Sequence, residues 1–396
     1  MHGEKIMTPI HGVRVLEIAS FITGPYAAML LGDLGADVVK IEHPKGGDPF
    51  RTWSRGNYSP QYRAYNRGKR SLTLDLKSPK GIEVLHDLLA KADVLIENFR
   101  PGTAERLGFG YEALAERYPK LIYCSVTGFG KTGPYRSRPS YDTVGQGYSG
   151  LLRLLMDADN PRPVGPAFSD CITGVFACYG ILGALLARER SGLGQKVELS
   201  MLSATLSFLI EPAVAYLSAG EVNNCFTRPR VSQVYAAACE DGKLLAIHLS
   251  SPPKFWASLT EAIAMTELRQ DPRFANREKR IANYESLAAI LGDVLKQKPR
   301  AHWLEKFERF DVPCTPIYDM SEVFADPQVK HAGLEIEYSH SQEGVTRSVR
   351  PAVSFSRTEL EKAAPPPALG EHSKGILLEL GYESDRIRSL QDEGVI

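Results

Sequence analysis

The sequence has no excess of charge of either sign, because 47 lysines and arginines balance 47 aspartates and glutamates in 396 residues. Without a net field, we expect no general binding to nucleic acid or to an anionic membrane surface. The nine histidines are scattered, no HExxH or GxSxG pattern occurs, and no two cysteines stand in a CxxC arrangement. Zinc and serine-hydrolase motifs are therefore absent, and we predict no metal site.

Long hydrophobic runs are also scarce, and the N-terminus lacks the apolar segment of a secretory signal. The only membrane candidate, residues 171–187, is interrupted by Thr173 and Tyr179, and small residues recur in it at helical spacing. We predict a closely packed core helix there rather than a membrane span. The six cysteines stand mostly in apolar strings, which predicts reduced, buried thiols in a cytoplasmic protein.

Short β-branched segments alternate with helical patterns through the first 200 residues. This order predicts right-handed crossovers and an α/β fold, a Rossmann-like doubly wound parallel sheet. The predicted strands cover residues 13–19, 37–43, 71–76, 94–99 and 121–128, and the predicted helices cover 24–36, 79–92 and 110–118.

The pattern changes beyond the helices expected near residues 171–219. Two strands around Asp241 and Gly242, three helical patterns and an extended segment at 311–319 predict a smaller α+β domain at 225–325. A proline-rich connection at 364–377 is expected to lead into one final helix.

One carboxylate, Asp170, stands at the head of the uncharged run. A charged group beside an apolar segment costs free energy unless it caps a helix, pairs with a cation or takes part in chemistry. Ser169 or Asp170 would suit a helix N-cap, so the local sequence favours capping and leaves catalysis as the alternative.

Two glycine-rich matches to GxGxxG, at residues 128–133 and 145–150, lack the strand–turn–helix context of a dinucleotide site. The first runs into Pro134 and a basic loop, and no clear strand precedes the second. A P-loop is excluded because Ser125 stands where that motif requires its first glycine.

Polar and basic side chains gather near the predicted carboxyl ends of the strands, where open α/β sheets bind their ligands. Taken singly, each of these residues fits a solvated loop surface, but together they supply the several cations that a phosphorylated cofactor would need. The cluster consists of His43, Lys45, Arg51, Lys77, Asn98, Arg100 and Arg106.

Six segments in the same order resemble the class III CoA-transferases, the family named after carnitine and bile-acid CoA-transferases. They are GVRVLEIASFITGPYAAMLLGDLGADVVKIEHPKGGDPFR, NRGKRSLTLDLKSPKG, ADVLIENFRPG, YCSVTGFGKTGPY, the stretch around Asp170, and APPPALGEHSKGIL. The resemblance runs nearly end to end, and it is strongest to members that transfer CoA between succinate and other dicarboxylic acids.

The resemblance implies that Asp170 is the nucleophile and that CoA lies along the Rossmann-like domain. It also implies a large domain built from both chain ends, residues 1–224 and 326–396, and a homodimer of subunits threaded through each other. No cofactor beyond the CoA thioester is implied; the other partner is a carboxylic acid. The implied CoA contacts are Ile22, Thr23, His43, Leu74, Asp75, Leu76, Lys77, Asn98, Phe99, Arg100, Arg106, Tyr141 and Asp142.

In the family's scheme the aspartate first forms a mixed anhydride with the acyl group and then a thioester with CoA, and the acceptor acid reverses these steps. We expect the carboxylate of Asp170 to stay ionised near its helix N-terminus.

The sequence departs from the family pattern in two places. His43 stands where many relatives carry arginine, which favours stacking on adenine over a charge clamp. Residues 250–253 read Ser-Ser-Pro-Pro where formyl-CoA transferases have a glycine loop, so formyl and oxalyl substrates are disfavoured. Arg51 or Arg55 is then a candidate to bind the distal carboxylate of a dicarboxylic acyl group.

Two other functions stay open. An α-methylacyl-CoA racemase would share the fold, but it requires a histidine where this sequence has Tyr141, and an ordinary tyrosine with a pKa of about 10 is a poor base. A non-catalytic acyl-CoA-binding protein would bind CoA thioesters and tolerate the loss of Asp170.

Overall fold

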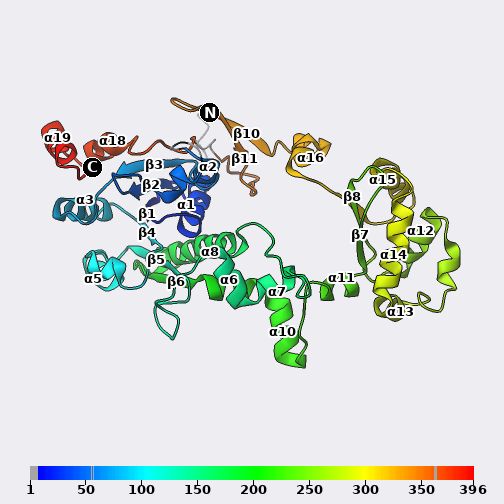
Figure 1. Ribbon diagram of the computed structural model, residues 1–396. Coiled ribbons are helices and arrows are strands. Elements are labelled where there is room, and N and C mark those ends of the chain that lie inside the picture. Colours follow the sequence, from blue (N-terminus) through cyan, green and yellow to red (C-terminus); the bar gives the residue numbers. More distant parts are fainter. Residues whose placement is uncertain (1–7, 55, 57, 361–363) are drawn as a thin grey trace. The chain divides into compact units, whose positions relative to one another are not determined.

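The computed structural model describes residues 8–54, 56, 58–360 and 364–396 (Figure 1). The chain divides into two compact units. The first combines residues up to 152 with 165–210 and 335–396, and the second combines 153–164 with 211–334. The domain boundaries expected from the sequence, at 224/225 and 325/326, stay a prediction.

A six-stranded sheet forms the centre of the first unit, and all its strand pairs are parallel. The strand order is β3-β2-β1-β4-β5-β6, which is the Rossmann order, so the predicted fold class is confirmed. The strands are β1 (Arg14–Ile18), β2 (Asp37–Glu42), β3 (Lys69–Thr73), β4 (Val94–Glu97), β5 (Ile122–Thr127) and β6 (Lys196–Ser200).

Helices cover both faces of this sheet because successive side chains of each strand point to opposite faces. Val15 and Ile96 face one helical layer, α1 and α8, whereas Leu16 and Leu95 face the other, which includes α3, α5, α18 and α19. The helices of this unit are α1 (Thr23–Asp33), α2 (Pro60–Tyr65), α3 (Pro79–Leu89), α4 (Thr103–Arg106), α5 (Tyr111–Arg117), α6 (Asp142–Ser149), α8 (Phe168–Ser191), α9 (Met201–Phe208), α18 (Ser373–Glu379) and α19 (Ser384–Asp392).

The C-terminal segment joins the core of the N-terminal half. Tyr58 donates a hydrogen bond to the Pro366 carbonyl, and the Gly370 N–H donates to Ser71 Oγ, which lies on β3. The prediction of one final helix is wrong, because Gly381 adopts a φ of 92° and ends the first of two helices, α18 and α19. The hairpin β10 (Glu335–His340) and β11 (Gly344–Val349) was also not predicted.

Helix α8 contains the apolar run at residues 171–187. No charged residue follows Asp170 in this helix until Arg188. It is the one helix in the described ranges that alone is long and apolar enough to cross a membrane. Ala177 and Ile181 on α8 are buried against the sheet, which is the packing expected of a core helix. Each of the six cysteines is a free thiol.

The second unit has a three-stranded antiparallel sheet packed against helices, as the α+β pattern predicts. Leu245, Ile247 and Trp256 belong to its own buried core. Its elements are α10 (Ile210–Ala219, beginning one residue before the unit), α11 (Thr227–Val231), β7 (Val234–Ala238), β8 (Leu244–His248), α12 (Pro253–Ala262), α13 (Arg277–Ala282), α14 (Tyr284–Leu295), α15 (Arg300–Arg309), β9 (Cys314–Ile317), α16 (Met320–Ala325) and α17 (Pro327–His331).

Candidate active site

The strand order reverses between β1 and β4, and the loops that follow these two strands are tied together. Asn98, directly after β4, accepts a hydrogen bond from the Ser20 N–H (3.1 Å) and donates to the Ser20 carbonyl (2.8 Å). It also donates to Thr23 Oγ1 at 3.1 Å. In open α/β sheets the crevice at this reversal is the usual ligand site.

Two neighbouring cavities open at this edge of the sheet, and Ser20 and Phe99 line both. The first has a volume of about 200 Å³ and lies over the ends of β2 and β3. The second has a volume of about 320 Å³ and reaches Asp170.

The structure gathers most of the expected CoA-contact residues around these cavities. The first cavity is lined by His43, Leu74, Asp75, Leu76, Lys77 and Phe99. The second is lined by Ile22, Thr23, Asn98, Phe99, Arg100, Tyr141 and Asp170.

Two expected contacts lie outside both linings, and two cations were missed. Arg106 points its guanidinium toward Thr103 Oγ1 at 3.2 Å, and Asp142 bonds to the first turn of α8. Arg136 and Arg138 line the second cavity from the loop after β5. The sequence could have indicated both arginines, because they follow a predicted strand in the same way as Arg100 does.

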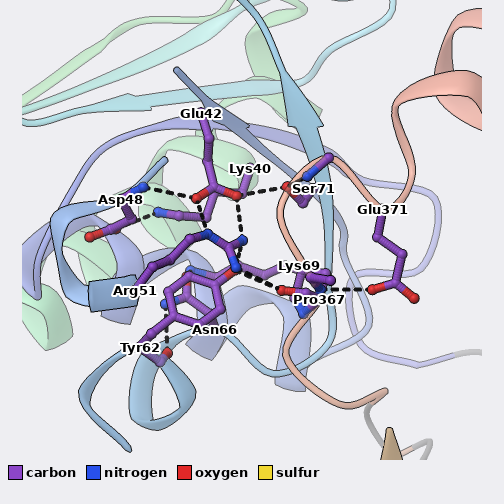
Figure 2. Close-up of polar contacts among 12 residues, drawn as sticks. Lys40, Glu42, Asp48, Arg51, Tyr62, Asn66, Lys69, Ser71, Pro367 and Glu371 are labelled. Atoms are coloured by element: carbon purple, nitrogen blue, oxygen red, sulfur yellow. Dashed lines mark hydrogen bonds and ion pairs between the residues drawn. The ribbon is translucent and has the colours of Figure 1, made fainter. Parts of the chain in front are cut away.

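A buried network of charges adjoins the first cavity, which Glu42 and Asp48 help to line; Figure 2 shows part of this network. Lys40 pairs with Glu17 at 2.6 Å and with Asp48 at 2.9 Å, and Lys69 pairs with Glu17 at 2.6 Å. Glu42 receives two hydrogen bonds from the Arg51 guanidinium, at 2.8 and 2.7 Å. These opposite charges compensate one another where water cannot reach them.

Arg51 is therefore not available to bind a substrate carboxylate, and that expectation is wrong. Its side chain is 1% exposed, and its remaining donors reach Tyr62 and the Pro367 carbonyl (Figure 2). A guanidinium that faces a buried carboxylate in this bidentate way cannot leave without uncovering an unpaired charge. The other candidate, Arg55, lies outside the described residues.

The same network fixes the loop that follows β1. Asp48 accepts a hydrogen bond from the Phe21 N–H at 3.3 Å. Phe21 has a φ of 66°, a conformation that costs free energy for a residue other than glycine. Its ring makes edge contacts with Phe50 and Tyr141, so the loop is held from both its backbone and its side chain.

Asp170 lies in the first turn of α8 but does not cap it, and neither does Ser169. The N-cap residue is Ala167, which has no side-chain acceptor. The N–H groups of Ser169 and Asp170 instead donate to Asp142 Oδ1, at 2.9 and 3.3 Å. Within residues 8–54, 56, 58–360 and 364–396, no group donates a hydrogen bond to the Asp170 carboxylate itself.

The environment of Asp170 disfavours its charge. Burial, and next the carboxylate of Asp142, raise the pKa of Asp170 from 3.8 to about 7. The expectation of a carboxylate held ionised by the helix N-terminus is therefore wrong, since burial and a like charge outweigh the helix dipole. Burial also raises the pKa of Cys171 and of Tyr65, so both side chains stay neutral near pH 7. The Tyr65 hydroxyl oxygen lies 3.8 Å from Cys171 Sγ.

A Rossmann-like sheet whose ligand edge carries a weakly acidic carboxyl group and several arginines is suited to bind an anionic ligand beside that carboxyl group. The chain belongs to CoA-transferase family III, whose sequence pattern matches residues 10–373. It is thus an enzyme that transfers CoA between acids.

Relatives of known activity agree with this class. The human succinyl-CoA:glutarate CoA-transferase is 35% identical over 98% of this chain and 90% of its own length. The acetyl-CoA:oxalate CoA-transferase of Acetobacter aceti is 38% identical over 83% of this chain and 86% of its own. A CaiB/BaiF family protein from Brucella suis has a similar crystal structure, with a TM-score of 0.85 and 35% identity, covering 94% of this chain and 100% of that one.

The raised pKa of Asp170 predicts how it affects stability. The folded protein retains this proton up to about pH 7 whereas the unfolded chain loses it near pH 4, so Asp170 lowers the free energy of unfolding progressively across that interval. Asp170→Asn should therefore have a higher free energy of unfolding than wild type at pH 8, by up to about 4 kcal/mol, as measured by urea denaturation. This gain in stability should shrink at pH 5.

Asp385→Asn is the matched control, because Asp385 stands in the first turn of α19 with its side chain 86% exposed. Its urea profile should follow that of wild type at both pH values. Parallel curves for Asp170→Asn and wild type between pH 5 and 8 would contradict the assignment of a raised pKa.

Proposed function

We propose that the enzyme moves CoA from succinyl-CoA, or a similar dicarboxylic acyl-CoA, to a free carboxylic acid through covalent intermediates on Asp170. The observation that carries this proposal is a half-buried carboxylate that lines the larger cavity and receives no hydrogen bond. A carboxylate that is poorly solvated and of raised pKa is a better nucleophile than one in water.

The proposed reaction has four steps, and each forms one bond to an acyl carbon and breaks another. The Asp170 carboxylate attacks the thioester carbonyl, the C–S bond breaks, and CoA leaves as a thiolate. The thiolate then attacks the Asp170 Cγ of the anhydride, which releases the first acid and leaves an aspartyl thioester. The acceptor carboxylate displaces the thiolate from Cγ, and the thiolate finally attacks the acceptor's acyl carbon and frees Asp170.

No metal or further cofactor is needed in this sequence, because each step exchanges one nucleophile for another at an acyl carbon. Both substrates are anionic, and Arg100, Arg136 and Arg138 line the cavity that contains Asp170. Shelter from water favours transfer over hydrolysis of the anhydride.

The racemase alternative is weaker on the same geometry. Moving a proton on and off an α-carbon needs a base such as histidine beside the carboxylate. No histidine is among the described residues that line the cavity with Asp170, and Tyr141 occupies the expected place. Membership in a transferase family disfavours the non-catalytic alternative.

We further propose a cytoplasmic homodimer with threaded subunits. Val175, Tyr179 and Leu186 on α8 and Leu206 and Phe208 on α9 are exposed apolar side chains, and a second copy of the chain would cover them. Free cysteines support a reducing compartment. Sedimentation that showed a folded, active monomer at nanomolar concentration would contradict the threaded dimer.

The nucleophile is tested by Asp170→Asn. The amide cannot attack a thioester, so CoA transfer should fall by at least about 1000-fold, while the fold is retained because Asp170 caps nothing. Hydroxylamine added to wild-type enzyme and acyl-CoA should modify the peptide that contains Asp170, as mass spectrometry can show. Asp385→Asn should keep full activity. An active Asp170→Asn protein, verified to be free of deamidation, would exclude the covalent mechanism.

The substrate class is tested by a grid of acyl-CoA donors against free acids, with the CoA products measured by mass spectrometry. We expect donors and acceptors with four to six carbons and two carboxylates to give the highest kcat/KM, because the segment at 250–253 lacks the glycines of formyl-CoA transferases. If formyl-CoA or oxalate belongs to the best pair, the proposed substrate class is wrong.

A further inference from the structure

The first turn of α8 is capped by a side chain from another helix. A helix begins with N–H groups that have no partner of their own, and a Ser, Thr, Asp or Asn at the N-cap usually supplies one. Here Ala167 cannot, and Asp142 at the start of α6 accepts from the N–H groups of Ser169 and Asp170. The nucleophile's own backbone is thus bound to Asp142.

Asp142 is itself held in place. Its second oxygen, Oδ2, accepts a hydrogen bond from Gln146 Nε2 at 2.5 Å, one turn further along α6. Gln146 is 3% exposed, and its Nε2 also donates to the Pro166 carbonyl at 3.3 Å, just before α8. Both carboxylate oxygens of Asp142 therefore have defined partners, and the segment leading into α8 is bound to α6.

The packing leaves this junction little room to adjust. A Cβ atom at Gly145 would lie 2.3 Å from Ser169 Oγ, so α6 approaches the first turn of α8 as closely as glycine allows. Ser169 Oγ in turn bonds to Thr205 Oγ1 on α9 at 2.8 Å. Helices α6 and α9 thus both hold the first turn of α8.

We propose that Asp142 is a positioning residue for Asp170: it takes over the capping of α8 and places a second carboxylate beside the nucleophile. This inference rests on the proposed function, and it replaces the expectation that Asp142 binds CoA, since Asp142 lines neither cavity. The cap leaves the carboxylate of Asp170 free for substrate instead of for its own helix.

The second effect is electrostatic. The ionisable groups around Asp170 are Asp142 on α6, Cys171 on α8, Tyr65 on α2 and Tyr141, with Arg100, Arg136 and Arg138 around the same cavity. After burial, the negative charge of Asp142 is the contribution that raises the pKa of Asp170 to about 7. Because the nucleophile must be ionised, kcat/KM should rise with pH through about 7 in the wild-type enzyme.

Asp142→Asn separates positioning from substrate binding. The amide oxygen can still accept from α8, so the cap is kept while the charge is lost. Gln146 can rotate its amide to accept from the new NH₂, which gives up its bond to the Pro166 carbonyl. We expect the acid limb of the kcat/KM profile to move down by about one pH unit, which makes activity at pH 6 about half of its plateau instead of about a tenth. The KM for acyl-CoA should change little. Asp142→Ala should move the limb in the same direction and also lower the unfolding temperature, because it removes the cap.

Asp319→Asn is the matched control. Asp319 also caps a helix, α16, and it lies in the second unit. Its variant should keep the wild-type pH profile.

An acid limb of the kcat/KM profile that stays at the wild-type pH in both Asp142 variants would overturn the proposal. If the KM for acyl-CoA also rose in these variants, Asp142 would be a CoA contact instead. Failure of the proposed function has a different signature, because Asp170→Asn would then remain active whatever Asp142 does.

Discussion

All six strands of the main sheet run in one direction, and this constraint creates the site. Parallel strands deliver their following loops to one edge. Each strand is followed within two residues by a residue that lines at least one of the two cavities: Ser20, His43, Leu74, Asn98, Gly128 and Met201. Asp170 is the exception, since it arrives on a helix, and its position depends on how α8 begins.

The site combines rigid support with a carboxylate that has no partner. Beside the first cavity, Lys40, Arg51 and Lys69 neutralise three buried acids, Glu17, Glu42 and Asp48, and Figure 2 shows the last two. Asp170 receives no such compensation, and its raised pKa shows that the fold bears a cost for keeping it there. A nucleophile that is stabilised less by its surroundings has more to gain by forming a bond to the substrate.

The local signals in the sequence were sufficient for five of the six strands and for much of the sheet's edge, but β6 was not predicted and β3 begins two residues before its predicted start. β-branched segments predicted the bounds of β1, β2, β4 and β5 to within about two residues. The rule that ligands bind at the carboxyl ends of strands predicted His43, Lys77 and Arg100 as site residues. Contacts between distant residues were out of reach. Arg51 is bound by a carbonyl 316 positions away, and the cap of α8 comes from 27 positions before it, so neither role leaves a mark in the neighbouring sequence. Ser169 and Asp170 had the composition of a cap, but composition does not show that another side chain already occupies that role.

The most direct test of the account follows oxygen atoms. If the acceptor acid carries ¹⁸O in its carboxylate, its oxygen bridges to Cγ in the second anhydride and remains on Asp170 when the thiolate departs with the acceptor's acyl group. After one turnover, the peptide that contains Asp170 should therefore gain about 2 mass units, the difference between one ¹⁸O and one ¹⁶O in the exchange that the mechanism requires. Normal CoA transfer with no label in this peptide would contradict the covalent role of Asp170.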